Sequence, residues 1–212
     1  LTKDSFMAKQ TQQIDYLQVK AGAVTISPVD IDKYVTDSTL TIGRISVSNV
    51  FMTDYKDRRL PYVEGLIKPL PAKLVRKIPI KLAIDTLLID NGHIEYSEMS
   101  SLTNRMGLVP VTRLTAKIYP IRNYNLKSGD TLRIHANAYL LDTMWMRLRV
   151  NQSYTDTLEG FMMTFRMKPA DATLLNPMLV PLASAKILSG RLDTMSMRAV
   201  GREQLAFGEM KM

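Results

Sequence analysis

The sequence lacks the residues on which several classes of site depend. It contains no cysteine and only two histidines among its 212 residues. Without cysteine the chain forms no disulfide and offers no thiolate, and a structural zinc site is not expected. No apolar run is long enough to span a bilayer as a helix, and no charged-then-apolar leader of the secretory type is present. The absence of cysteine is compatible both with a reducing cytoplasm and with a periplasm in which mispairing is avoided.

The motifs of common enzymes are missing as well. The sequence has no glycine-rich phosphate loop and no Gly-x-Ser-x-Gly elbow. Asp90, His93 and Glu95 are close in sequence, but they lack the spacing of a metal site and are better explained as a solvated strand edge. His135 falls on the polar face of another expected strand. We therefore expect no enzymatic activity, no metal and no cofactor.

Two features of the composition favour particular partners. The net charge of +8 favours acidic partners, although no dense block of lysine and arginine is present. The chain also has 14 methionines against 5 phenylalanines. Methionine is flexible and suits surfaces that accept varied apolar partners, and it also fills irregular cores. The composition leaves both interpretations of the methionines open.

Alternation of apolar and polar residues dominates the chain and predicts a mainly β, antiparallel fold. We expect repeated long strands and hairpins in a curved sheet or groove, or a sandwich-like arrangement, with one or two short helices. One helix is predicted to begin at Pro71 and to stop before Pro79, with Leu70, Leu74 and Ile78 on one face. Residues 1–212 are interpreted as a single β-rich region.

The dipeptide Asn91-Gly92 predicts a tight hairpin, because a type I′ turn needs positive φ at both central residues. Leu87, Ile89, Ile94 and Tyr96 would then share one apolar face. A second hairpin is predicted with a three-residue connection that pairs Leu140 with Met144. That register keeps both apolar sets on one face, whereas a two-residue turn would separate them.

The opposite face of the second hairpin is basic and aromatic. It carries Arg133, His135, Asn137, Tyr139, Trp145, Arg147 and Arg149. Platforms for single-stranded nucleic acid have this mixture. The outer face of a sheet has it too, and no RNA-recognition signature is present, so we expect no nucleic-acid partner.

A spacing motif recurs along the chain. Leu40-x-Ile42-x-x-Ile45-x-Val47 reappears forty-two residues later as Leu82-x-Ile84-x-x-Leu87-x-Ile89, and a weaker copy begins at Gly190. We therefore assign weak internal repeats near residues 40–55, 82–97 and 190–205. A two-residue period interrupted by one extra residue indicates a β-bulge or a sharp twist.

These residues carry a resemblance to a known family. The pattern Ile84-Asp-x-Leu87-x-Ile89-x-Asn91-Gly92-x-Ile94-x-Tyr96-Ser97-Glu98 resembles the AsmA and TamB group of envelope proteins, particularly its Bacteroidetes-type members. Similar spacing occurs in Leu108-Val109-Pro110-Val111, in Leu174-Leu175-Asn176-Pro177, and in the segments 187–192 and 205–210. The resemblance covers roughly residues 40–212 and involves hydrophobic spacing rather than a catalytic motif.

The resemblance implies a β-groove segment with no enzymatic activity. Such proteins lie on the periplasmic side of a Gram-negative envelope, are held in the inner membrane by an N-terminal helix, and are associated with lipid transport and outer-membrane homeostasis. The implied partners are a phospholipid or another acyl-chain lipid, and the membrane through an anchor outside this chain. The candidate lipid-facing residues are Leu87, Ile89, Ile94, Tyr96, Leu140, Met144, Met146, Phe161, Met163 and Phe165.

An alternative and a boundary expectation accompany this hypothesis. The same apolar residues would serve as the dry core of a β-sandwich that acts as a structural or protein-interaction module. Leu1 and Met212 interrupt patterned sequence, so we expect both ends to be artificial, with the anchor upstream in a longer native chain.

Overall fold

The computed structural model describes residues 2–66, 68–202 and 205–211, so Leu1 and Met212 lie outside the described residues. The strands in these ranges are β1 (Tyr16–Lys20), β2 (Val24–Asp30), β3 (Thr39–Ser48), β4 (Phe51–Asp57), β5 (Lys81–Met99), β6 (Met106–Tyr119), β7 (Ile121–Arg122), β8 (Thr131–Leu140), β9 (Met144–Ser153), β10 (Phe161–Met167), β11 (Ala170–Asp171), β12 (Arg191–Leu192), β13 (Met195–Arg202) and β14 (Leu205–Lys211). The helices are α1 (Lys3–Met7), α2 (Ile31–Asp37), α3 (Pro71–Arg76), the 3₁₀ turn η1 (Ala172–Leu175) and α4 (Asn176–Ala183).

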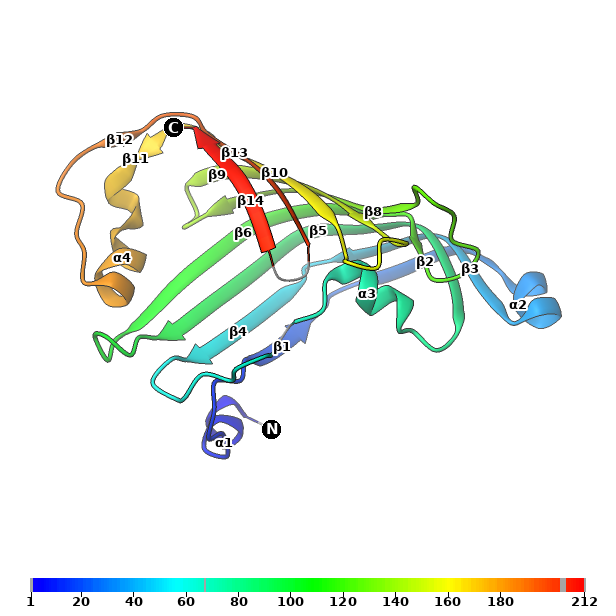
Figure 1. Ribbon diagram of the computed structural model, residues 1–212, viewed down its shortest axis with the longest axis horizontal. Helices are drawn as coiled ribbons and strands as arrows, with labels where there is room; N and C mark the ends of the chain where they lie inside the picture. The colour runs from blue at the N-terminus through cyan, green and yellow to red at the C-terminus, as the bar shows by residue number, and fades with distance from the viewer. Residues whose placement is uncertain (1, 67, 203–204, 212) are drawn as a thin grey trace.

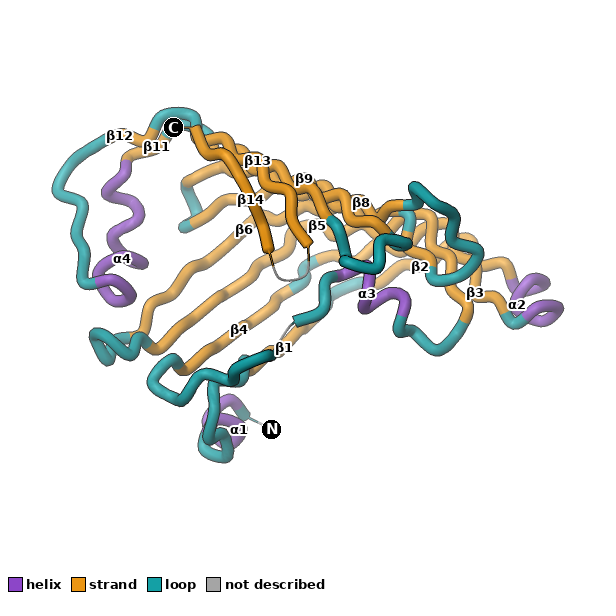
Figure 2. The backbone as a smooth tube through the Cα atoms, viewed as in Figure 1, coloured by secondary structure: helices purple, strands orange, loops and turns teal. Residues whose placement is uncertain are grey.

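Among the described residues, twelve strands form one large sheet that curls without closing into a barrel (Figure 1). Its path runs β1-β4-β5-β6-β8-β9-β10-β13-β14. Off this path, β3 pairs with the first part of β5, β2 pairs with β3, and β7 pairs with β5 at Ala83 and Ile84. One edge is formed by β1 and β2 and the other by β14. The helices lie near the ends and edges of the sheet, with α4 at one end and α2 and α3 toward the other (Figure 2). The mainly β fold is confirmed.

The first two copies of the repeat pair with each other. Leu40 lies opposite Leu82 and Val47 opposite Ile89, a constant separation of 42 residues, and β3 runs parallel to β5. The same separation continues in β4, which also pairs in parallel with β5. The sheet is therefore mixed rather than wholly antiparallel. The third copy is not one strand, because its first part lies in the separate pair β11–β12 and β13 begins only at Met195.

The predicted hairpin at Asn91-Gly92 is wrong. The single strand β5 continues through both residues from Lys81 to Met99. Asn91 does have a positive φ of 50°, and the register against β6 shifts on either side of Gly92, so the dipeptide forms a bulge. The Nδ2 group of Asn91 donates a hydrogen bond of 2.7 Å to Oδ1 of Asn49, its counterpart in the first repeat. The left-handed residue that signals a tight turn serves here to bend a paired strand.

The extra residue in the repeat is matched in the neighbouring strands. Ile42 and Ile45 lie opposite Ile84 and Leu87, and those two lie opposite Ile121 and Ile118. The same three-residue step thus occurs at the same level in β3, in β5 and from β6 to β7, so the pairing of these residues is kept across it. Residues on both sides of the step contact one hydrophobic cluster. The apolar residues therefore stay on one face through the step, and β3 and β5 keep a constant register across it.

Two other local predictions, the β8–β9 hairpin and the start of α3, are confirmed, and the predicted buried face of α3 is not. The hairpin β8–β9 has the three-residue connection and the register expected for it, with Leu140 opposite Met144 and Ile134 opposite Val150. Helix α3 begins at Pro71 as predicted. Its expected face is wrong at Leu74, which is 53% exposed while Ala72 is 2% exposed, although Ile78 does pack against the core.

One end of the sheet is sealed by α3. There, buried residues from four strands, from α3 and from the loop after β9 pack together: Ile42, Ala72, Leu82, Ile84, Ile121, Leu132 and Tyr154. The side chain of Gln152, on β9, accepts a hydrogen bond of 2.9 Å from the backbone N–H of Ala72. The opposite end lies under α4, since a Cβ placed on Gly107 of β6 would overlap Leu182. Both helices cover the same face of the sheet, at opposite ends.

Candidate functional site

Between these two covered ends, two rows of apolar residues cross the sheet. Row 1 consists of Val24, Val47, Ile89, Ala116, Ala136, Leu148, Phe165, Met197 and Met210. Row 2 consists of Ile26, Ile45, Leu87, Ile118, Ile134, Val150, Met163, Ala199 and Gly208. Each row takes one residue from each of nine strands. We call the side of the sheet that carries them the apolar face, and the other side the outer face.

The rows arise from strand geometry and register together. Side chains alternate between the two faces of a strand, and residues directly opposite each other on paired strands point to the same side. Nine strands spaced about 4.8 Å apart give each row a length of about 40 Å around the curl. No charged residue interrupts either row. The apolar face is therefore continuous from one edge strand to the other.

The middle of the apolar face is only half-buried. In row 2, Ile45, Leu87 and Ile118 are partly buried against the cluster under α3. Farther along the row, Ile134, Val150 and Met163 also retain partial exposure, and Ala199 falls to 8%. At the edge of row 1, Val24 is 54% exposed and Met210 is 56% exposed. A sealed core of this size would bury most such residues completely. Here, neither another sheet nor a helix among the described residues covers the middle.

Four of the residues proposed from the sequence lie in the rows, namely Leu87, Ile89, Met163 and Phe165. The other six lie on the same face beside the rows. Ile94, Tyr96, Leu140, Met144 and Met146 are toward the end covered by α4, and Phe161 is toward the other end. Met144 is only 1% exposed, so it belongs to a covered part of the face and not to its open middle.

Sequence reasoning missed most members of the rows. Examples are Ala116, Ala136 and Leu148, which continue the row that contains Ile89. The alternation within each strand places these residues on the apolar face. Their membership of a row depends on the register between strands that are distant in sequence, and the sequence does not give that register.

The two halves of the apolar face differ in chemistry. The half formed by β2, β3, β5, β6 and β8 presents mainly isoleucine, valine and alanine. The half formed by β9, β10, β13 and β14 presents methionines: Met146, Met163, Met167, Met195, Met197 and Met210. β-branched residues are stiff and methionine is flexible, so one wall is rigid and the other adaptable.

A polar cluster closes the apolar face at the ends of β4 and β5. Glu98 is 7% exposed and accepts hydrogen bonds from the Tyr96 hydroxyl at 2.5 Å and from Arg58 Nε at 2.8 Å. Burial and the contact with Glu98 raise the pKa of Tyr96 to about 12. Asp54 lies opposite Tyr96, and burial raises the pKa of its carboxyl. Apolar contact in the middle thus gives way to polar contact at this rim.

The remaining chemistry of the described residues is sparse. They contain no group of three or more histidine or carboxylate side chains placed to hold a metal ion. Their helices are all too short or too polar to cross a membrane. His93 stacks on Phe51 with ring centroids 4.8 Å apart, and its Nε2 lies 3.2 Å from Glu95.

Comparisons of the chain with protein-family models, with curated proteins and with solved structures found no match.

Proposed function

We propose that this chain is a non-enzymatic β-groove segment that holds the acyl chains of a lipid against its apolar face, as part of a periplasmic lipid-transport or outer-membrane homeostasis protein of the AsmA-like type. The observation that carries the proposal is the pair of nine-residue apolar rows, half-buried across the middle of a curled sheet. The resemblance noted in the sequence supplies the compartment and the inner-membrane anchor outside this chain.

The energetics of an open apolar face support a lipid ligand. Each methylene removed from water contributes about 0.8 kcal/mol, so an acyl chain of ordinary length gains several kcal/mol by lying along the rows. Soluble monomers rarely expose a contiguous apolar surface without a binding role. The methionine wall formed by residues such as Met163 and Met197 suits a ligand whose chains are mobile.

The alternative, a β-sandwich module with a dry core, needs a second layer over the same face. Among the described residues that layer consists of α3 at one end and α4 at the other. The incompletely buried middle residues, among them Leu148 and Phe165, favour the lipid-holding function.

A matched pair of substitutions on β10 tests the proposal. Phe165 is on the apolar face and its neighbour Thr164 is exposed on the outer face. Phe165→Glu and Thr164→Glu change the charge equally. We expect native mass spectrometry of protein purified from a Gram-negative envelope without harsh detergent to show bound lipid in the parent and in Thr164→Glu. Phe165→Glu should remain folded and lose at least about nine-tenths of that lipid.

Two results would contradict the proposal. One is a parent protein that carries no lipid and takes up none when offered phospholipid. The other is equal lipid retention by both variants, since binding would then not involve the apolar face.

A further inference from the structure

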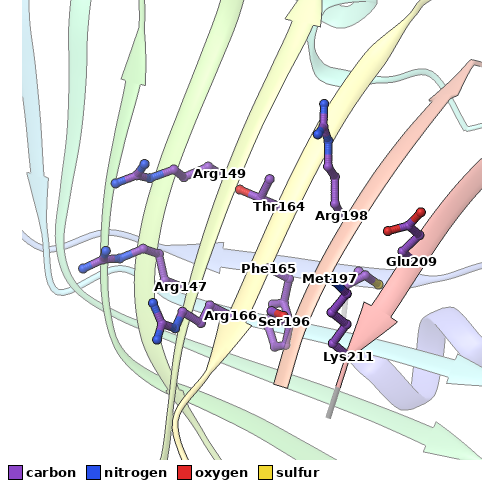
Figure 3. Close-up of a pocket in the computed structure, with 10 residues that line it drawn as sticks. All are labelled: Arg147, Arg149, Thr164, Phe165, Arg166, Ser196, Met197, Arg198, Glu209 and Lys211. Carbon is purple, nitrogen blue, oxygen red and sulfur yellow. The ribbon is translucent and has the colours of Figure 1, made fainter. Parts of the chain in front are cut away.

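The outer face of β8, β9, β10 and β13 carries a surface of arginines. Arg147 lies opposite Arg166, and Arg149 lies opposite Thr164, which in turn pairs with Arg198. Arg133 extends the set on β8. Figure 3 shows the side chains of Arg147, Arg149 and Arg166 extending to the same side of their strands. They line a shallow depression whose far border is formed by β14.

Among the described residues that line this depression, the one carboxylate is Glu209 on β14, which lies opposite Arg198. No ion pair there involves Arg147, Arg149 or Arg166, and the pairs that do form lie elsewhere. Arg147 donates instead to the neutral Oδ1 of Asn137 at 3.0 Å. Like-charge neighbours on adjacent strands cost stability, so a surface that keeps them together has a reason other than folding.

Aromatic rings are interleaved with the cations. The Trp145 ring contacts two cations: Cζ of Arg147 is 5.1 Å from its centroid, and Nζ of Lys168 is 5.0 Å from it. Lys117 lies 4.5 Å above the Tyr119 ring in the same way. Tryptophan and tyrosine beside lysine and arginine are typical of the water–lipid interface.

Exposed apolar residues border the arginines on the same face. Val200 lies opposite Phe207, and they are 47% and 71% exposed. Leu205, two residues before Phe207 on the edge strand, is 67% exposed. Val200 is two residues from Arg198, so the apolar strip and the cationic surface are contiguous.

We propose that this outer face, from β8 to β14, docks on a bilayer that contains anionic phospholipids, with the arginines on headgroup phosphates and Phe207 and its neighbours in the interfacial region. Charge complementarity selects an anionic surface. The exposed aliphatic strip selects a bilayer over a polynucleotide, because a polynucleotide offers no apolar layer for Val200 and Leu205. The aromatic rings point to the same choice, since they are paired with cations and not presented as open stacking platforms.

The proposal adds a second membrane contact to the chain and does not depend on lipid in the apolar face. The strip lies on β13 and β14, and β14 is also the edge of the apolar face. Docking would therefore bring one open edge of that face to the bilayer surface.

The only tryptophan of the chain reports the contact directly. Purified protein is mixed with phosphatidylcholine vesicles that contain or lack 30% phosphatidylglycerol, and the emission of Trp145 is recorded. We expect a blue shift, and quenching by brominated acyl chains, with the anionic vesicles. Both effects should weaken strongly between 50 and 500 mM salt, and both should be absent with neutral vesicles.

Two triple variants test the location of the contact. Arg147→Gln, Arg149→Gln and Arg166→Gln together should lower the vesicle partition coefficient at least about tenfold, because each basic residue near an anionic surface contributes about fivefold. The control removes the same charge at Lys9, Lys81 and Lys127, which are exposed elsewhere, and should change partition by less than about threefold. Phe207→Ser should lower partition severalfold and reduce the quenching by brominated chains.

Several outcomes would overturn the proposal. They are a Trp145 spectrum unaffected by anionic vesicles, equal losses in the two triple variants, and displacement of the protein from vesicles by single-stranded oligonucleotide at equal phosphate concentration. Met163→Glu, in row 2 of the apolar face and away from the arginine-lined depression, serves as the separating control. Its vesicle binding should equal that of the parent even though lipid in the apolar face is lost, so the two proposals can fail independently.

Discussion

The sealed end and the open middle of the apolar face are built from the same kinds of residue, yet they differ in exposure. Leu132 and Ile42, at the end under α3, are 1% and 4% exposed. Leu148 and Ile134, in the middle, are half-buried. The strands and the alternation are continuous between the two regions. Whether an apolar sheet face becomes a core or a binding surface is decided here by a six-residue helix.

The cover is held in place by polar contacts. Ala72 donates its backbone N–H to Gln152, Arg76 donates to the backbone oxygen of Tyr154 at 3.0 Å, and Lys73 pairs with the buried Glu159 at 2.7 Å. These contacts fix α3 over one set of strand residues. A binding surface differs in that its apolar residues have no such helix fixed over them.

The largest expected effect comes from placing a charge in each region. Leu132→Glu should lose several kcal/mol of unfolding free energy, because a buried carboxylate without a partner is costly and total stabilities are commonly 5–15 kcal/mol. Leu148→Glu should cost less than about 1.5 kcal/mol, since water reaches that site. Urea titration of both variants checks the difference, and equal losses would remove the distinction between the regions.

A smaller effect is expected from loosening the cover. Gln152→Ala removes the acceptor of the Ala72 N–H and should cost about 1–3 kcal/mol, the usual consequence of leaving a buried backbone group unpaired. Asn151→Ala, the adjacent change on the outer face, should be close to neutral. Thermal unfolding of the two variants, with hydrogen exchange at Ala72, measures the effect. Unchanged protection of that amide would argue against Gln152 as the anchor of α3.

The two paired asparagines allow a test of the bulge in the open region. Asn91→Ala should cost about 1–2 kcal/mol, because it loses a hydrogen bond and places alanine at positive φ. Asn91→Gly removes only the hydrogen bond and should cost less. A double-mutant cycle with Asn49→Ala isolates the pair, and a coupling energy near zero would mean that the side chains do not interact in solution.

The smallest expected effect is a pH dependence at the rim of the open face. The pKa of Tyr96 is raised to about 12, above the ordinary tyrosine value near 10. The folded state holds this proton more tightly than the unfolded state does. The corresponding stability is complete below pH 10 and is lost as the pH rises through about 12. Tyr96→Phe should flatten this alkaline loss, and an unchanged pH profile would place the titration elsewhere.

Local sequence signals predicted the strands, the β8–β9 hairpin and the start of α3, because each depends on neighbouring residues. They failed where distant segments decide. Asn91-Gly92 carries a turn signal, but β5 has partners on both sides over its whole length, so the left-handed residue is absorbed as a bulge. The parallel pairing of the two repeats and the membership of the rows likewise require inter-strand register. The buried side of α3 was missed because the small Ala72, not Leu74, fits against the sheet.

The most direct test of the central claim uses two adjacent methionines on β10. Met163 belongs to row 2 and Met162 lies on the outer face, opposite Asn151 and Val200. A photo-reactive diazirine amino acid is placed at either position, and the purified protein is irradiated with monomeric lysophospholipid below its micelle concentration, so that no bilayer is present. Mass spectrometry should find the lipid adduct at position 163 and little at position 162. Equal labelling at both positions, or none at 163, would contradict an open, lipid-holding apolar face.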